Sequence, residues 1–236
     1  MAITVFDDSI FNNATDVTSF AEASYAHVGT LMLVFLQWRE TVTSDGGISF
    51  DTMTFNGLDL AQVASVISGG VHSEIWALAT SKLNVVGDIN GTWGGDTATG
   101  RASAVWHVLS LNGTAEDLPG AIHNATTGTG SSTTPTLAVT TDFATSFAVD
   151  CLGLNNSSLG DVTITPGDTE VGGPLGVAGA TLRLQSDAQR QTASVGTTTM
   201  NYSLSASRAW GMCGCEVLAA TTCDLIADQG MVPIER

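Results

Sequence analysis

The chain contains 236 residues and carries a formal net charge of −16 at pH 7, from 23 acidic and only 7 basic side chains. Nucleic-acid binding requires clustered Lys and Arg that displace counterions, so this charge excludes DNA and RNA as direct ligands and disfavours anionic membranes. Only 6% of the residues are aromatic and 13% are charged, whereas Gly occurs 26 times. This composition favours many short strands joined by tight turns over helices.

The N-terminal segment has no basic region and contains Asp7 and Asp8, so we expect no secretory signal peptide. The most apolar run, residues 31–36, is far shorter than the ~20 residues that a membrane helix requires. It is better explained as part of a buried central strand over residues 30–38. We therefore expect a protein that makes no membrane contact.

The first half of the chain is predicted to be a series of strands. Between residues 52 and 79, Asn56-Gly57 and Gly69-Gly70 mark two tight turns, which predicts a three-stranded antiparallel meander. Residues 83–93 contain internal turn residues and are predicted as a broken strand or a pair of strands. The other predicted strands of this half are 3–6, 16–24, 30–38 and 102–111.

The second half begins with a Gly/Ser/Thr-rich segment, residues 125–135, which is predicted as a surface loop. Strands at 136–140 and 146–152 are expected to form a hairpin. Residues 160–179, which are rich in Gly, are predicted as a long exposed loop. The remaining predicted strands are 180–184, 191–195, 201–207 and 209–218.

Regularly spaced strands joined by turns, without a sustained 3.6-residue period, predict an all-β fold. We expect a single antiparallel β-sandwich, of jelly-roll type, over residues 1–218. Residues 219–236 lack strand alternation and are predicted as a C-terminal tail that packs on its own domain or reaches a neighbour.

The chain has four cysteines, Cys151, Cys213, Cys215 and Cys223. Cys213 and Cys215 share one face of a predicted strand, near or beyond the usual separation for a disulfide. Three interpretations stay open. Small buried apolar residues are favoured, a bridge to Cys223 is the second, and a metal site is the third, although the spacing departs from common zinc pairs.

None of the four histidines belongs to a recognised catalytic or metal motif: His27, His72, His107 and His123. His72 and Ser73 precede Glu74, but adjacent strand residues point to opposite faces and cannot share a proton. Two oxygen-rich turns, at 43–47 and 88–92, lack the spacing of an EF-hand loop. We predict no catalytic, cofactor-binding or metal-binding residue, and a structural cation somewhere in the chain stays open.

Glu74 is the best candidate for a glycosidase acid because it lies beside Trp76, which with Trp93 or Trp106 could form a sugar platform. Such chemistry needs a second carboxylate ~5–9 Å away, and the sequence pairs none with Glu74. Tryptophans in strands usually lie in the core, so we predict that Trp76 and Trp106 are buried. Trp93, which precedes Gly94-Gly95, is predicted to be exposed.

Three segments, TFNGLDL (54–60), EIWAL (74–78) and STTPTLAV (132–139), occur in this order. They resemble a sandwich module of tailed-bacteriophage virion proteins, in which a T-x-N-G-x-x-L turn is followed by a strand ending in Trp, a Gly/Thr-rich loop and a T-P-x-x-x-V strand. The resemblance covers residues 50–152, and the chain departs from it after residue 160.

The resemblance implies a non-enzymatic virion structural protein, assembled in the host cytoplasm. The expected role is a capsid decoration (cement) protein that stabilises the head, or a fibre or tail component. Expected partners are the major capsid protein or other virion proteins and, because closed symmetry suits a local three-fold position, two further copies in a homotrimer. Candidate interfaces are residues 125–135, 160–179 and 219–236.

The alternative is a carbohydrate-binding or receptor-binding module of a tail fibre or surface adhesin. In that role, Trp93 or Tyr202 would be an exposed ring on which a surface glycan stacks.

Overall fold

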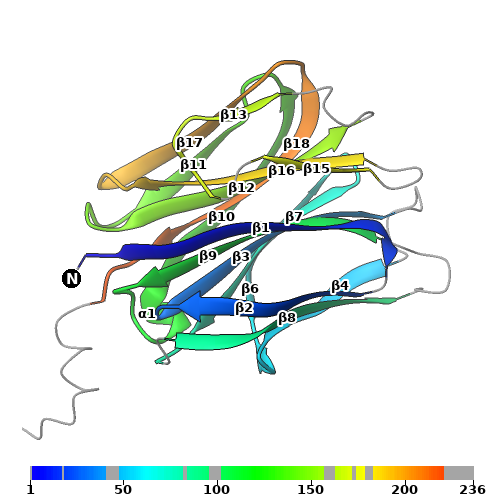
Figure 1. Cartoon of the computed structure of the whole chain (residues 1–236). Helices are drawn as coiled ribbons and strands as arrows, with labels where there is room; N and C mark the ends of the chain where they lie inside the picture. The colour runs from blue at the N-terminus through cyan, green and yellow to red at the C-terminus, as the bar shows by residue number, and fades with distance from the viewer. Residues whose placement is uncertain are drawn as a thin grey trace, which may run out of the picture.

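The computed structural model describes residues 2–17, 19–40, 48–81, 84–95, 102–156, 163–171, 174–178 and 183–220. Within these ranges the chain forms eighteen strands and one four-residue helix, and every strand pairing is antiparallel. This confirms the predicted all-β fold. The strands form four sheets stacked in layers, which Figure 1 shows from the β11-β17-β13 sheet at the top to the β2-β8-β4 sheet at the bottom.

The first half of the chain supplies two of these sheets. Its outer sheet has the order β2-β8-β4-β5, and its inner sheet has the order β1-β9-β3-β7-β6. The strands are β1 (Thr4–Val17), β2 (Ser19–Val28), β3 (Leu31–Glu40), β4 (Ile48–Phe55), β5 (Leu58–Asp59), β6 (Ala61–Ser68), β7 (Val71–Ala79), β8 (Asn84–Gly95) and β9 (Ala102–Asn112).

The second half begins with the helix α1 (Leu118–Ala121) and supplies the other two sheets. Its inner sheet has the order β10-β18-β12-β16-β14, with β15 also paired to β16, and its outer sheet has the order β11-β17-β13. The strands are β10 (Ile122–Ser132), β11 (Thr136–Thr141), β12 (Phe147–Asn156), β13 (Ile164–Pro166), β14 (Thr169–Glu170), β15 (Leu175–Ala178), β16 (Arg183–Thr192), β17 (Gly196–Leu204) and β18 (Arg208–Val217).

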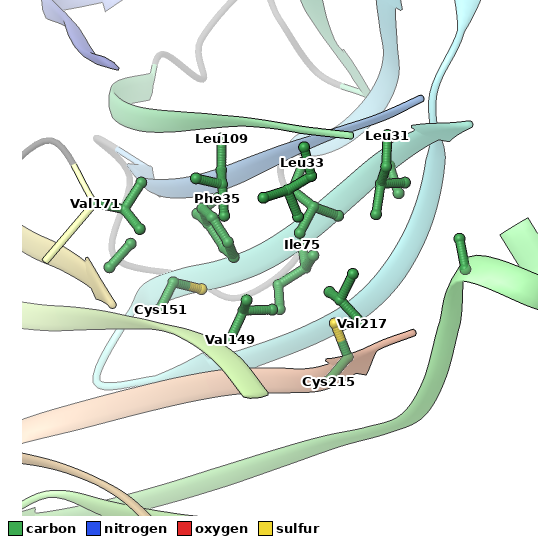
Figure 2. Packing of buried hydrophobic residues seen from close by; sticks show 14 of the residues in the cluster. Leu31, Leu33, Phe35, Ile75, Leu109, Val149, Cys151, Val171, Cys215 and Val217 are labelled. Carbon is green, nitrogen blue, oxygen red and sulfur yellow. The ribbon is translucent and has the colours of Figure 1, made fainter. Parts of the chain in front are cut away.

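The two inner sheets pack face to face and share one hydrophobic core. Figure 2 shows Leu33, Phe35 and Ile75 of the first half directed toward Val149 and Cys215 of the second. All five side chains are fully buried. Each inner sheet is therefore covered on both faces, which explains why β3 is a continuous apolar run and confirms the buried strand predicted over residues 30–38.

A second core lies between the inner and outer sheets of the first half, and a third lies between those of the second half. Met32, Val34 and Leu36 alternate with the β3 residues of the central core and face the outer sheet of their own half. Tyr202 and Trp210 belong to the third core. Sandwich-type packing is thus confirmed and extends over four layers, while jelly-roll connectivity stays a prediction.

The predicted meander over residues 52–79 is wrong in one respect. Both turns are present, with positive φ at Asn56, Gly57, Gly69 and Gly70. However, β4 and β5 belong to the outer sheet, whereas β6 and β7 belong to the inner sheet. The chain therefore crosses between layers around Leu60 and makes two separate hairpins.

The predicted loop over residues 125–135 is also wrong, because most of it belongs to strand β10 at the end of an inner sheet. The glycines have a packing reason: a Cβ atom at Gly130 would lie 2.5 Å from the ring of Trp210. Glycine in this strand makes room for the indole on the neighbouring strand β18. The indole of Trp210 fills the space that a side chain at Gly130 would occupy.

The structure corrects three further predictions, which concern a hairpin, a broken strand and a loop. The strands predicted at 136–140 and 146–152 exist, but β11 lies in an outer sheet and β12 in an inner sheet, so they form no hairpin. The described part of 83–93 lies in one continuous strand, β8. The predicted loop at 160–179 contains the short strands β13, β14 and β15 in its described parts.

Most of the predicted tail, residues 221–236, lies outside the described residues, as does the turn at 43–47. Ala219, at its start, forms an isolated antiparallel bridge with Thr114. The division into a domain over 1–218 and a tail over 219–236 stays a prediction.

Candidate functional site

The two predicted ligand-binding aromatics are buried, so the prediction that they are exposed is wrong. Trp93 is 4% exposed and packs edge-on against Phe20 and Phe50, with ring centroids 5.6 Å and 5.2 Å away. One glycine near Trp93 serves the core: a Cβ atom at Gly91 would lie 2.3 Å from the Phe20 ring. Gly94, on which the prediction of exposure rested, lies instead against the side chain of Asp51.

Tyr202 is 1% exposed and lies in the core between β17 and the inner sheet of its half. Its hydroxyl donates a hydrogen bond of 3.0 Å to Oδ1 of Asp150, which is itself fully buried. Burial raises the pKa of both groups well above their ordinary values. Neither Trp93 nor Tyr202 presents a ring face on which a sugar could stack.

Glu74 is also buried, and three donors occupy its carboxylate. Trp38 Nε1 donates to Oε1 at 2.8 Å, while Trp76 Nε1 and Gln62 Nε2 donate to Oε2 at 2.7 Å and 3.1 Å. Burial raises the pKa of Glu74, and the three hydrogen bonds act in the opposite direction. This arrangement fixes two indoles in the core and occupies both oxygens of the carboxylate.

Two histidines, His27 and His107, are fully buried, and a third, His72, is half-buried. His72 stacks on Trp38 with ring centroids 3.6 Å apart, whereas the adjacent Ser73 donates to the carbonyl of Gly211 in the other inner sheet. Burial lowers the pKa of His27 and of His107 to about 4. Both rings are therefore neutral near pH 7.

Cys151, Cys213 and Cys215 are free thiols that are fully buried between the inner sheets. This confirms the favoured interpretation for these three residues, while Cys223 lies outside the described residues. Cys151 lies opposite Cys213 in the register of β12 and β18, and the Cys213 thiol donates to the Ser73 carbonyl at 2.9 Å. Burial is the main reason why the pKa of Cys215 is raised.

One cluster that the sequence did not indicate has the composition of a metal site. His123, Asp142 and Glu216 each offer one ligand atom, and these atoms lie within 4.8 Å of one another. His123 belongs to β10 and lies opposite Glu216 of β18 in the strand register, while Asp142 follows β11. Among the described residues, this is the one group of three or more His, Cys, Asp or Glu with such spacing.

A β-bulge shapes this cluster. The pairing of β10 with β18 slips between His123 and Thr126, so that two residues on β10 oppose one on β18. Asn124, at the bulge, has φ of 51°, a conformation that Asn tolerates better than most residues. Its amide nitrogen donates to Asp142 Oδ2 at 3.0 Å and to Glu216 Oε2 at 3.2 Å.

The Glu216 carboxylate is fully buried and held from its other side. Its Oε1 accepts hydrogen bonds from the backbone N–H groups of Asp142 and Phe143, at 2.9 Å and 3.1 Å, and from the Ser146 hydroxyl at 2.6 Å. These donors compensate the desolvation of the charge and fix the position of Oε2. His123 and Asp142 also remain partly accessible, with side chains 37% and 51% exposed.

A groove of about 360 Å³ adjoins the cluster and shares His123 and Asn124 with it. Its other walls come from the start of β6 and from the region of α1 and β10. The sequence offered no signal for this site, because the three ligand residues are far apart in the chain and belong to no spaced motif. Only the register of β10 against β18 and the course of the chain after β11 bring them together.

Among the described residues, the one helix, α1, has four residues and is far too short to span a bilayer. Comparisons of the chain with protein-family models, with curated proteins and with solved structures find no match.

Proposed function

We propose that the protein is a non-enzymatic structural component of a virion, acting as a capsid decoration (cement) protein through contacts with other proteins. The observation that carries the proposal is the four-layer stack, in which two sheets are covered on both faces (Figure 1). Side chains that often perform catalysis, such as Glu74, Asp150 and His107, are committed to hydrogen bonds inside this stack. The resemblance of residues 50–152 to virion sandwich modules supports the same role.

The sheet edge at β10 is the contact surface that best suits this role. β10 is the terminal strand of its sheet, and Thr127, Thr129 and Ser131 alternate outward as exposed residues. A terminal strand offers backbone N–H and C=O groups to a strand of a neighbouring chain. We propose that β10 mediates a homotrimer or attachment to the major capsid protein. The interface role predicted for residues 125–135 is thus kept, with a strand in place of the predicted loop.

Light scattering of the purified chain tests assembly, and sedimentation with capsids tests attachment. We expect a mass three times the 24.3 kDa of the chain, or co-sedimentation with capsids. The paired substitution Thr127→Lys and Thr129→Lys should weaken either interaction, because lysine on a strand edge opposes further pairing. Thr199→Lys, an exposed position on β17, is the control.

A monodisperse monomer that does not bind capsids would overturn the proposal. So would assembly that the lysine pair and the control affect equally. The glycan-binding alternative is not proposed, because Trp93 and Tyr202, on which it depended, are buried.

A further inference from the structure

We propose that His123, Asp142 and Glu216 bind one divalent transition-metal ion of the zinc class. The ligand atoms would be His123 Nδ1, Asp142 Oδ2 and Glu216 Oε2, with water completing the coordination. This site is independent of the proposed virion role, since it rests on the local geometry at the end of β10.

The separations of the ligand atoms suit a small ion. Zinc binds imidazole nitrogen and carboxylate oxygen at about 2.0–2.2 Å, so tetrahedral ligands lie roughly 3.4 Å apart. His123 Nδ1 and Asp142 Oδ2 are already 3.7 Å apart, and one nitrogen or carboxylate oxygen from each of the three residues lies within 4.8 Å of the others. Small side-chain rotations of the two partly exposed residues would bring the set to coordination distance.

The tautomer of His123 leaves a lone pair on Nδ1, which faces the proposed metal position. Its Nε2 lies 3.0 Å from the backbone carbonyl of Pro119, which can only accept a hydrogen bond, so Nε2 carries the proton. In the neutral ring, Nδ1 is then an acceptor, and it faces the Asp142 carboxylate, which is a second acceptor. A metal-bound histidine is characteristically held in this way by a carbonyl at its other nitrogen.

Glu216 supplies the buried negative charge. Its Oε1 is saturated by the three donors from Asp142, Phe143 and Ser146, whereas Oε2 receives only the Asn124 amide. The Asn124 amide nitrogen donates to both Asp142 Oδ2 and Glu216 Oε2, and the space between these two oxygens attracts positive charge. A half-turn of the Asn124 amide would replace its donor by Oδ1, a fourth oxygen for the ion.

The donor types select the metal. One imidazole nitrogen with two carboxylates favours Zn²⁺ and its neighbours over Ca²⁺ or Mg²⁺, which prefer oxygen ligands alone. No thiol lies in the cluster, so a Cu⁺ site is disfavoured. The bound ion would join the start of β10, the segment after β11 and the end of β18, and would thereby stabilise the strand edge.

Isothermal titration with ZnCl₂, in a large excess of MgCl₂, tests the site, because Mg²⁺ competes for diffuse binding to this acidic surface. We expect one Zn²⁺ per chain. His123→Ala and Asp142→Asn should each weaken binding at least about tenfold, since even residues outside the first coordination shell contribute 10–100-fold. Asp59→Asn, which removes an exposed carboxylate on β5, should leave binding unchanged.

Mn²⁺ provides a second measurement that depends on position. In NMR spectra of the wild-type chain, substoichiometric Mn²⁺ should broaden amide signals of residues 117–126, 141–146 and 214–218, and this selective broadening should disappear in Asp142→Asn. The competing explanation is an ion pair between protonated His123 and Asp142 with no metal. Failure to bind one Zn²⁺, binding that both ligand variants retain, or broadening spread over the surface would overturn the proposal.

Discussion

Asp187 gives the sharpest prediction about stability. It lies on β16 and is fully buried, and its Oδ1 accepts a 2.8 Å hydrogen bond from the Ala188 N–H. Its Oδ2 has no hydrogen-bond partner among the described residues. Burial, with a smaller contribution from the charge of Glu170, raises the pKa of Asp187 to about 8.

The sign of the effect follows from the two pKa values of this carboxyl. In the unfolded chain it ionises near its ordinary value of 3.8, whereas in the folded chain it keeps its proton to about pH 8. The folded state therefore binds more protons between these values, and the free energy of unfolding falls as pH rises through the interval. From pH 6 to pH 8 the loss is about 2 kcal/mol, because a difference of one bound proton changes the free energy of unfolding by 1.36 kcal/mol per pH unit and the folded carboxyl is half ionised at about pH 8.

Asp187→Asn cannot ionise and should remove this component. We expect the free energy of unfolding of the variant, relative to wild type, to rise by about 2 kcal/mol between pH 6 and pH 8. Urea unfolding at constant ionic strength measures both proteins at each pH. The lowered pKa values of His27 and His107, about 4 against the ordinary 6.5, add a pH dependence that wild type and variant share, so it cancels in the difference between them.

Asp59→Asn, an exposed carboxyl on β5, is the matched control and should show no such change. Parallel pH profiles for wild type and Asp187→Asn would refute the reasoning, because they would show that Asp187 is ionised in the folded chain throughout the interval.

Two other predictions test the packing of the inner sheets. Gly130→Ala would place a methyl group 2.5 Å from the Trp210 ring and should lower the free energy of unfolding by about 1–3 kcal/mol, whereas Thr129→Ala on the outward side should have a small effect. Thermal unfolding distinguishes them, and equal losses would contradict the glycine argument. The three cysteines buried between the inner sheets should resist a thiol reagent in the native protein and react on unfolding, since the reagent cannot reach a sulfur atom that has no exposed surface. Rapid native labelling of any of these three, identified by peptide mass analysis, would contradict this placement.

The fold class was predictable because strand and turn signals are local. Asn56-Gly57 and Gly69-Gly70 form turns wherever the flanking strands pair, since glycine and asparagine tolerate positive φ. Sheet membership was not predictable in the same way. Alternation states which side chains share a face, but β4 and β6 satisfy it equally well in one sheet or in two.

The errors at single residues have a common origin. Gly91 and Gly130 were interpreted as signs of turns or loops, whereas each makes room for an aromatic ring that comes from a distant part of the chain. A glycine in the sequence is compatible with a turn and with the close approach of another side chain to the backbone. Only the position of the neighbouring strand distinguishes the two. Trp93 was expected at the surface because Gly94-Gly95 follows it, yet its ring lies in the core.

The sequence by itself determined the antiparallel β character, the tight turns and the buried strand β3, because these depend on side-chain alternation and backbone conformations over a few residues. The tertiary structure alone decided the four-layer stack and the His123, Asp142 and Glu216 cluster. Both depend on which strands pair and in which register. That choice is set by the burial of whole sheets against one another, a property that no short segment carries.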